Sequence, residues 1–376
     1  MANGSLTSDW VPAFAAVPRS AFLPDLMWPF DMSTGQTVTV NRADEPAVWQ
    51  RYADSDTPVV TQWDDGRHTG TAPGHVSTSS ASMPSVVFGM LRDLDVHPGH
   101  RVLEIGTGTG WNAALLAHRL GAGNVVTVEI DEAVSSAART ALERRGFPVR
   151  VVHGDGARGF PEAAPYDRVI ATCGLRAVPF SWVEQCRPGG VVVAPWGTHY
   201  SNADAVARLV VADDGTSASG RFTGPVEFMK LRAQRRPPVK HSDYVMGTVA
   251  DGDESTTTVT EDRFVAGQFG PLQFALGIRV PDCACVVADK RDGARPVWFY
   301  GLSDRSWACV MFRDGDAARV WQSGPRRLWD ETESALRWWE DEGRPGHERF
   351  GLTLTAEEHR VWLDDPDNTE ACAPKY

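Results

Sequence analysis

The stretch Arg101-Val-Leu-Glu-Ile-Gly-Thr-Gly-Thr-Gly-Trp111 decides the fold of this chain. Its first half is a short apolar run between Pro98-Gly99 and Gly106, which is typical of a buried parallel strand. Glycines follow at every second position, and residues 111–120 then have the pattern of a helix that ends at Gly121. A strand, a glycine-rich turn and a helix in this order predict the first unit of a doubly wound α/β sheet.

The same alternation of strands and helices continues along the middle of the chain. We expect further strands at residues 125–129, 149–153, 166–171 and 191–195, and helices at 131–145 and 182–186. Because strands alternate with helices, this order predicts a parallel sheet with right-handed crossovers. Residues 209–211 and 225–229 are candidates for a later antiparallel edge of the same sheet.

Composition and charge exclude several classes of protein. The chain has 376 residues, 42% of them hydrophobic and 23% charged, with a net charge of −12. Such an acidic chain repels nucleic acid and anionic membranes. Its start lacks the pattern of a secretory signal, no apolar run is long enough to span a bilayer, and its six cysteines are sparse. We therefore expect a cytoplasmic monomer that binds neither nucleic acid nor membrane.

Three regions are expected along the chain. Residues 1–75 form an N-terminal segment that faces the substrate, where Trp49, Tyr52 and Trp63 are candidates for one wall of a peptide groove. Residues 76–234 form the core. Residues 240–376 form a C-terminal auxiliary α+β domain. The boundary is placed at Arg235-Arg-Pro-Pro-Val-Lys240, because two adjacent prolines continue neither a helix nor a central strand.

Three features lie at the ends of successive expected strands, where such a sheet binds its ligands. Gly106 and Gly108 let the backbone approach a ligand closely. Glu129, at the end of the second strand, can accept hydrogen bonds from both hydroxyls of a ribose, and its distance from Gly106 in the sequence fits nucleoside sites. Asp155-Gly156 follows the third strand. Together these features predict a nucleoside-binding site.

The glycine spacing favours S-adenosylmethionine over a dinucleotide. The dinucleotide pattern needs G-x-G-x-x-G, whereas here the third glycine is Gly110 and the bulky Trp111 follows it. Glu104 adds negative charge, which suits a cationic ligand and repels phosphate. A nicotinamide-dependent oxidoreductase and a non-catalytic scaffold with this fold are the alternatives from other functional classes.

These residues resemble those of the protein-L-isoaspartate O-methyltransferase family. The resemblance lies in Val102-Leu-Glu-Ile-Gly-Thr-Gly-Thr-Gly110, Gly154-Asp-Gly156, Ala164-Pro-Tyr-Asp167, Pro188-Gly-Gly190 with Pro195-Trp-Gly197, and upstream in Val17-Pro-Arg-Ser-Ala-Phe-Leu-Pro24. It implies a class I S-adenosylmethionine-dependent methyltransferase fold, S-adenosylmethionine as donor and a side-chain carboxylate as acceptor. The cofactor-binding residues are then expected to be Thr78, Glu104, Gly106, Thr107, Gly108, Gly110, Trp111, Asn112, Glu129, Ile130, Asp155 and Gly156. Among them, Glu104 and the three glycines are expected at the methionine part, Glu129 at the ribose, and Asp155 with Gly156 at the adenine.

One segment departs from the family pattern. Where the family has a segment like Ile-Ser-Ala-Pro-His-Met-His, this chain has Thr78-Ser-Ser-Ala-Ser-Met-Pro84. Ser79 matches the family serine that touches the reacting carboxylate, whereas Ser82 and Pro84 replace the two histidines. A carboxylate is already ionised at neutral pH and needs no general base, so hydroxyl donors suffice to hold it. Ser79, Ser80 and Ser82 are the expected catalytic residues.

The changed segment and the C-terminal extension resemble a variant group that tailors ribosomally made peptides such as lanthipeptides. Arg349-Phe-Gly-Leu-Thr353 and Val361-Trp-Leu-Asp364 add to this second resemblance. It implies methylation of an aspartate in a modified precursor peptide, which leads through a succinimide to isoaspartate. Repair-type methylation of damaged proteins is the alternative within the same class. No metal is expected, because Cys283-Ala-Cys285 has no neighbouring Cys or His pair at ligand spacing.

Overall fold

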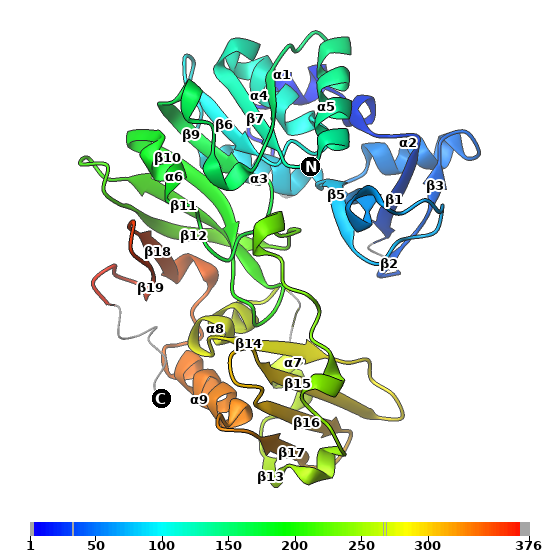
Figure 1. Ribbon diagram of the computed structural model, residues 1–376, viewed down its shortest axis with the longest axis vertical. Helices are drawn as coiled ribbons and strands as arrows, with labels where there is room; N and C mark the ends of the chain where they lie inside the picture. The colour runs from blue at the N-terminus through cyan, green and yellow to red at the C-terminus, as the bar shows by residue number, and fades with distance from the viewer. Residues whose placement is uncertain (1–3, 32–33, 266, 268, 369–376) are drawn as a thin grey trace.

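A computed structural model describes residues 4–31, 34–265, 267 and 269–368. Within them, a nine-stranded sheet forms the centre of the molecule. A five-stranded N-terminal sheet lies to one side of it, and a second five-stranded sheet lies below (Figure 1). The cavity discussed below lies where the central and N-terminal sheets meet.

The central sheet confirms the expected doubly wound architecture. Its strand order is β19-β18-β12-β11-β10-β9-β6-β7-β8, with parallel pairing from β10 to β8 and antiparallel pairing from β10 to β19. The strands are β6 (Val102–Ile105), β7 (Val125–Glu129), β8 (Arg150–His153), β9 (Tyr166–Ala171), β10 (Cys186–Trp196), β11 (Asp204–Val211), β12 (Ala218–Val226), β18 (Phe350–Leu354) and β19 (His359–Leu363). The expected antiparallel edge is present, and β11 contains residues 209–211. Its second strand was expected too late in the chain, at 225–229, whereas β12 ends at Val226.

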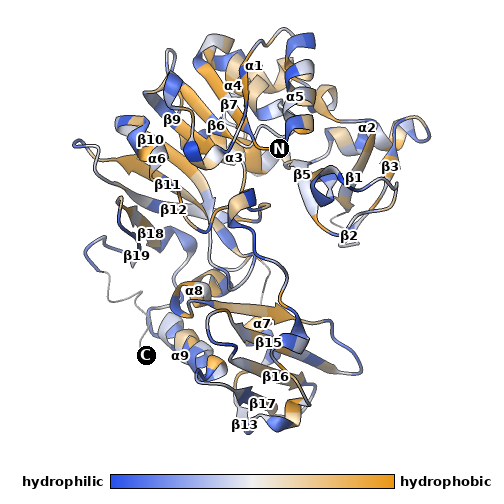
Figure 2. Ribbon diagram, viewed as in Figure 1, coloured by the Kyte–Doolittle hydropathy of each residue, from blue (hydrophilic) through white to orange (hydrophobic). Residues whose placement is uncertain are grey.

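Helices cover both faces of the central sheet. They are α1 (Val11–Ala16), α3 (Pro84–Leu94), α4 (Trp111–Leu120), α5 (Glu132–Arg144) and α6 (Ser181–Glu184). Side chains from α1, α3 and α4 share one hydrophobic core, and α6 contributes Trp182 to the core on the opposite face. Figure 2 shows the central strands as predominantly hydrophobic, as expected for strands that are buried on both faces.

The N-terminal sheet has the order β2-β1-β4-β5, and β3 also pairs with β1. Its elements are β1 (Leu26–Asp31), β2 (Gln36–Thr37), β3 (Val40–Asn41), α2 (Pro46–Asp54), β4 (Val59–Trp63) and β5 (Ser77–Ala81). Trp49 is 1% exposed and packs in the core of this lobe. The indole therefore serves packing, and the expectation that Trp49 walls a peptide groove is wrong.

The C-terminal sheet is antiparallel, with the order β13-β17-β16-β15-β14. Its strands are β13 (Asp253–Thr257), β14 (Cys283–Val287), β15 (Ala294–Gly301), β16 (Trp307–Arg313) and β17 (Ala318–Ser323), and its helices are α7 (Glu261–Val265), α8 (Pro271–Arg279) and α9 (Leu328–Asp341). The helices pack on one face of this sheet. Phe274 of α8 also packs against Phe222 and Phe350 of the central sheet, so one helix joins the two cores.

Two of the expected domain boundaries need correction. Residues 350–363 do not stay with the C-terminal sheet, because β18 pairs with β12 and extends the central sheet. This pairing covers a strand edge that would otherwise be open. At the other end, β5 pairs with β4 and so belongs to the N-terminal sheet, although it lies beyond residue 75. Among the described residues, no helix has both the length and the apolar character that crossing a bilayer requires.

Candidate cofactor and acceptor pocket

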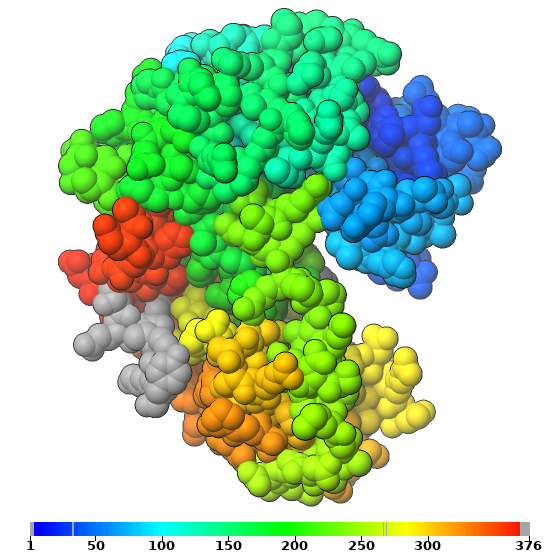
Figure 3. Space-filling model, in the orientation of Figure 1, coloured from blue at the N-terminus to red at the C-terminus, as the bar shows by residue number. Residues whose placement is uncertain are grey.

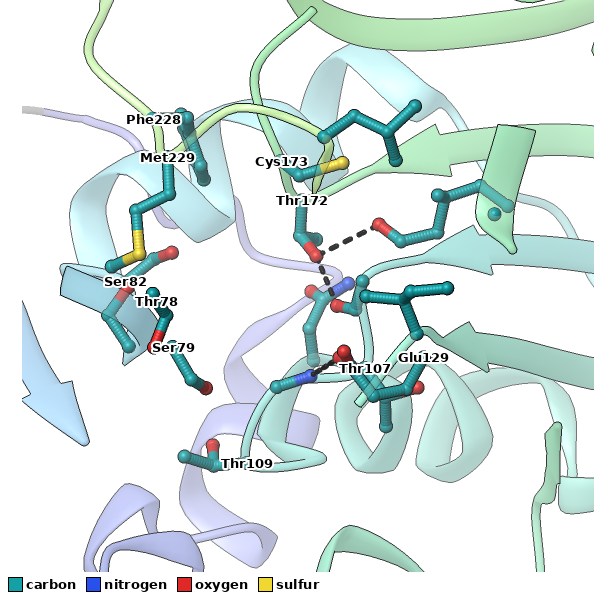
Figure 4. Close-up of a pocket in the computed structure, with 18 of the residues that line it drawn as sticks. Thr78, Ser79, Ser82, Thr107, Thr109, Glu129, Thr172, Cys173, Phe228 and Met229 are labelled. Atoms are coloured by element: carbon teal, nitrogen blue, oxygen red, sulfur yellow. Dashed lines mark hydrogen bonds between the residues drawn. The ribbon is translucent and has the colours of Figure 1, made fainter. Parts of the chain in front are cut away.

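A cavity opens at the carboxyl ends of β6, β7 and β9, with β5 along one side (Figure 4). One half of its lining comes from the central sheet and the other from β5 and the segment after β12. The lining consists of Thr78, Ser79, Ser80, Ala81, Ser82, Val87, Ile105, Gly106, Thr107, Gly108, Thr109, Trp111, Asn112, Val128, Glu129, Ile130, Gly156, Thr172, Cys173, Phe228, Met229, Lys230, Leu231, Arg232 and Arg235.

The turn after β6 takes its shape from glycines in left-handed conformations. Gly106 and Gly108 have φ of +94° and +53°. A Cβ atom at Gly106 would lie 2.9 Å from the hydroxyl of Thr172, and one at Gly108 would lie 3.3 Å from the Ser80 carbonyl oxygen. Any side chain here is therefore both strained and crowded. The turn brings bare backbone to the cavity.

Glu129 presents an acceptor pair at the end of β7. Its Oε2 accepts from the Gly108 backbone N–H at 3.0 Å, and its Oε1 accepts from the Asp131 backbone N–H at 3.1 Å. A carboxylate oxygen has a second lone pair, so both oxygens still have capacity for a ligand. Two adjacent ligand hydroxyls, such as those of a ribose, match this geometry.

Glu104 does not line the cavity as expected. Side chains alternate along β6, so Glu104 points to the face of the sheet that α4 covers, and it is 0% exposed. It accepts from Asn112 Nδ2 at 2.7 Å and from Thr127 Oγ1 at 2.6 Å. Burial raises the pKa of Glu104 to about 7, against the opposing effect of these hydrogen bonds. Because Thr127 also bonds Thr107 at 2.7 Å, Glu104 supports the glycine turn from beneath.

Three other expected cofactor residues also present no side chain to the cavity. Gly110 and Asp155 lie outside the lining, and Asp155 accepts from the Ala157 N–H at 3.0 Å, which caps the turn around Gly156. Trp111 borders the cavity, but its buried indole packs against Phe88 and donates to the Val17 carbonyl. The bulk of Trp111 therefore gives no steric argument against a diphosphate.

The three expected catalytic serines all line the acceptor half. Figure 4 shows Ser79 and Ser82 on the side of the cavity opposite Glu129, with Met229 next to Ser82. Ser79 accepts from Thr61 Oγ1 at 3.3 Å, and its own hydroxyl hydrogen has no acceptor among the described residues. That hydrogen is available to a substrate oxygen. Thr78 has a structural role, since it donates to Gln62 and accepts from the Asp65 N–H.

Three cations in the lining are neutralised by neighbouring carboxylates. Lys230 pairs with the buried Asp204, and burial lowers the pKa of Lys230. Arg235 lies 2.8 Å from Asp65. Arg232 lies 3.3 Å from Asp65 and 3.2 Å from Asp131. These pairs leave the charge of the cavity wall nearly balanced.

The ion pairs of Arg232 tie three distant parts of the chain together across the cavity. Asp65 lies just after β4, whereas Asp131 caps α5 and Arg232 lies after β12. Gln62 adds a hydrogen bond to Asp131 at 3.3 Å. We call Gln62, Asp65, Asp131, Arg232 and Arg235 the clasp. It holds the N-terminal sheet over the central one.

Sequence reasoning missed two groups of lining residues. Thr172 and Cys173 follow β9, so the rule that located Glu129 also locates them. Thr172 donates to the Ile105 carbonyl at 3.2 Å and to that of Gly106, and burial raises the pKa of the Cys173 thiol to about 12. Residues 228–232 do not directly follow a parallel strand, so this rule could not locate them. They reach the cavity because two backbone hydrogen bonds of 2.8 Å join Met229 and Leu231 to Gly174.

The residues present fit a cationic nucleoside better than a phosphate ligand. Glu129 offers paired acceptors to a ribose, and Ile130 follows it with an exposed apolar side chain beside the cavity. The three lining cations are already paired with carboxylates, which leaves little positive charge for a diphosphate. S-adenosylmethionine carries a sulfonium and an ammonium group, and neither needs an additional cation in the cavity wall.

Comparison with known proteins identifies relatives among the protein-L-isoaspartate O-methyltransferases. A family model described as Protein-L-isoaspartate(D-aspartate) O-methyltransferase (PCMT) matches residues 46–235. A protein-L-isoaspartate O-methyltransferase of Pyrococcus horikoshii is 46% identical over 152 residues, which are 40% of this chain and 67% of that protein. One of Methanopyrus kandleri is 43% identical over 122 residues, which are 32% of this chain and 54% of that protein. The matched part thus spans between half and two thirds of these relatives.

A solved structure described as a protein-L-isoaspartate O-methyltransferase resembles the whole molecule. It has a TM-score of 0.51 at 23% identity, and the match covers 96% of both chains. At this identity the likeness concerns the fold alone. It confirms the class I methyltransferase fold, and it extends over the C-terminal sheet. The C-terminal sheet is therefore part of the fold that the two chains share.

Proposed function

This chain belongs to the protein-L-isoaspartate O-methyltransferase family, and we propose that it transfers a methyl group from S-adenosylmethionine to an isoaspartyl carboxylate in a peptide or protein. The observation that carries the proposal is the two-sided cavity. Backbone and Glu129 form its nucleoside half, and hydroxyl groups without a free cation form its acceptor half. Family membership sets aside the nicotinamide-dependent alternative.

Both halves suit methyl transfer to a carboxylate. S-adenosylmethionine supplies an electrophilic methyl group when bound, and Glu129 with the glycine turn would hold its nucleoside part. The acceptor carboxylate is ionised at neutral pH, so this chain has no proton to remove. Its task is to align one carboxylate oxygen with the methyl carbon and to exclude water. The free hydroxyl hydrogen of Ser79 orients that carboxylate.

The neutralised cations matter for reactivity. An arginine that clamps the acceptor carboxylate would draw electron density from the attacking oxygen. Here Lys230, Arg232 and Arg235 are each engaged by a carboxylate of the chain. A neutral hydroxyl such as that of Ser79 fixes the acceptor with less loss of nucleophilicity. This arrangement supports a carboxyl acceptor.

A methylation assay tests the proposal. The chain is incubated with S-adenosylmethionine and a linear isoaspartyl peptide, and we expect the peptide to gain one methyl group as a base-labile ester. Ser79→Ala should lower kcat about tenfold, because it removes one hydrogen bond to a charged group, with little change in affinity for S-adenosylhomocysteine. Ser77→Ala is the matched control, since Ser77 lies on the same strand outside the lining.

A second candidate substrate is an L-aspartate in a constrained, ribosomally made peptide. It is favoured by the absence of histidine from the described lining, where Ser82 stands in place of a family histidine. In that reaction the next backbone amide nitrogen attacks the methyl ester, methanol leaves, and the succinimide opens with water to isoaspartate. The C-terminal sheet does not favour this candidate over the first, because the solved structure described above also contains this sheet.

The same assay separates the two candidates. Esterification of the linear isoaspartyl peptide, but not of a macrocyclic L-aspartyl peptide, supports the first. The reverse pattern, followed by a succinimide, supports the second. If neither carboxylate gains a methyl group while S-adenosylhomocysteine binds, carboxyl methylation is contradicted altogether.

A further inference from the structure

The segment that leads out of the cavity has an unusual charge. Residues 228–242 contain five Lys or Arg residues and no Asp or Glu, although the whole chain has a net charge of −12. These basic residues are Lys230, Arg232, Arg235, Arg236 and Lys240. Such a local excess of positive charge attracts anionic groups to this part of the surface.

The five cations fall into two groups. Lys230, Arg232 and Arg235 line the cavity, and each pairs with a carboxylate of the chain. Arg236 and Lys240 are exposed, and neither forms an ion pair or a side-chain hydrogen bond with any residue that the structure describes. The first group is explained by the clasp and by Asp204. Arg236 and Lys240 therefore stabilise no contact of this kind within the described part of the chain.

The two exposed cations lie on an extended path from the cavity. Arg236 directly follows Arg235, which is part of the lining. Pro237 and Pro238 keep the next residues extended, so Arg236 and Lys240 are separated by roughly 12 Å at about 3.1 Å per residue. Figure 3 shows this segment at the surface, between the central sheet and the C-terminal sheet, facing the N-terminal lobe.

We propose that Arg236 and Lys240 bind acidic residues that flank the acceptor carboxylate in an extended peptide substrate. This inference rests on the proposed function. An extended peptide advances about 3.3 Å per residue, so two acidic side chains four residues apart match the separation of the two cations. Elsewhere the net negative charge of the chain repels an acidic peptide, so these cations determine how it approaches and in which register it binds.

The test compares two peptides that differ only in flanking charge. Both carry the acceptor carboxylate that the methylation assay identifies, and one has Glu where the other has Gln at the flanking positions. We expect kcat/KM to be about three- to tenfold higher for the Glu peptide, mainly through a lower KM. Because exposed charges are screened by salt, the advantage should shrink as ionic strength rises.

A double variant assigns the effect to these residues. Arg236→Gln with Lys240→Gln should bring the ratio of kcat/KM for the two peptides close to one. Arg313→Gln with Arg337→Gln is the matched control, because both arginines are exposed and unpaired among the described residues but belong to the C-terminal unit. This control should keep the preference for Glu.

The outcomes are distinct from those that test the proposed function. Equal kcat/KM for the Glu and Gln peptides in the unaltered chain overturns this inference and leaves the proposed function intact. A preference for Glu that survives Arg236→Gln with Lys240→Gln also overturns it. Failure to methylate any carboxyl peptide contradicts the proposed function, and this inference fails with it.

Discussion

The two halves of the cavity are built in different ways. The cofactor half consists of turns that directly follow strands of one sheet, and its key contacts are backbone hydrogen bonds such as that from Gly108 to Glu129. The acceptor half joins β5 to residues 228–235, which lie far apart in the sequence and are held together by the clasp. The first half depends on local backbone conformation, and the second depends on contacts between lobes.

This difference predicts that the two halves respond differently to substitution. The glycine turn tolerates little change, because a side chain at Gly106 would meet Thr172 at 2.9 Å. The acceptor half is lined by small hydroxyl side chains and by half-buried arginines, whose replacement costs little folding free energy. Lys230 is the exception, because it pairs with the buried Asp204. Substitutions in the cofactor half should therefore change the affinity for the cofactor. Substitutions in the acceptor half should change only the kinetic constants for the acceptor peptide.

The largest effect is expected from Glu129→Ala. This variant removes the proposed hydrogen bonds to both ribose hydroxyls, each worth about 1.5–3 kcal/mol for a charged acceptor. Affinity for S-adenosylhomocysteine, measured by calorimetry, should fall about a hundredfold or more. Glu132→Ala is the control, since Glu132 is a neighbouring exposed carboxylate. Unchanged affinity in Glu129→Ala would show that the nucleoside binds elsewhere.

A stability effect is expected from the residue beneath the cofactor half. The pKa of Glu104 is about 7 in the folded chain, whereas the ordinary value for a solvated glutamate, which represents the unfolded chain, is 4.5. Between these values the folded state binds more protons, so the free energy of unfolding falls as pH rises from 4.5 to 7. The fall attributable to Glu104 is about 3 kcal/mol.

Glu104→Gln removes this titration. Urea unfolding at pH 5, 6, 7 and 8 should show the variant gaining stability relative to the unaltered chain as pH rises, by about 3 kcal/mol in total. Parallel stability curves for the two chains would contradict the assignment. Such a result would mean that Glu104 is ionised across this range in the folded chain.

The smallest effect is expected from the clasp. Asp65→Ala removes the partner of Arg235 and one partner of Arg232, two pairs that are partly open to solvent. At about 0.2–0.5 kcal/mol for each pair, KM for the acceptor peptide should rise two- to fivefold, and cofactor affinity should stay nearly constant. Glu254→Ala breaks a comparable pair with Arg319 on the C-terminal sheet and should change neither value. A loss of cofactor affinity equal to the rise in KM would contradict the separation of the two halves.

The central sheet was largely predictable because its signals are local. An apolar run bounded by glycine predicted β6, and the alternation of strands and helices predicted β7 and β9. The helix at 111–120 was predicted with the bounds that the structure gives it. The return of β18 and β19 to this sheet was not predictable, because strand pairing over such a distance leaves no local pattern. The role of α8 in joining the two cores was not predictable for the same reason. Its residue Phe274 packs against Phe350, which belongs to the returning strand β18.

The candidate site divides in the same way. Gly106, Gly108, Glu129 and Gly156 were placed at the cavity by their position after strands, and the structure brings them together. Glu104 was misplaced because charge alone was considered, whereas strand alternation turns its side chain into the core. Asp65, Arg232 and Arg235 had no signal, because an ion pair between lobes exists only once the lobes have met.

The sequence by itself determined the parallel strands of the central sheet, the glycine turn and the position of Glu129 after the second strand, because each depends on residues close together in the chain. Only the tertiary structure decided which carboxylate neutralises each lining cation and which two cations are left for a substrate. Burial and charge pairing depend on every segment that packs around a group, and those segments come from all parts of the chain.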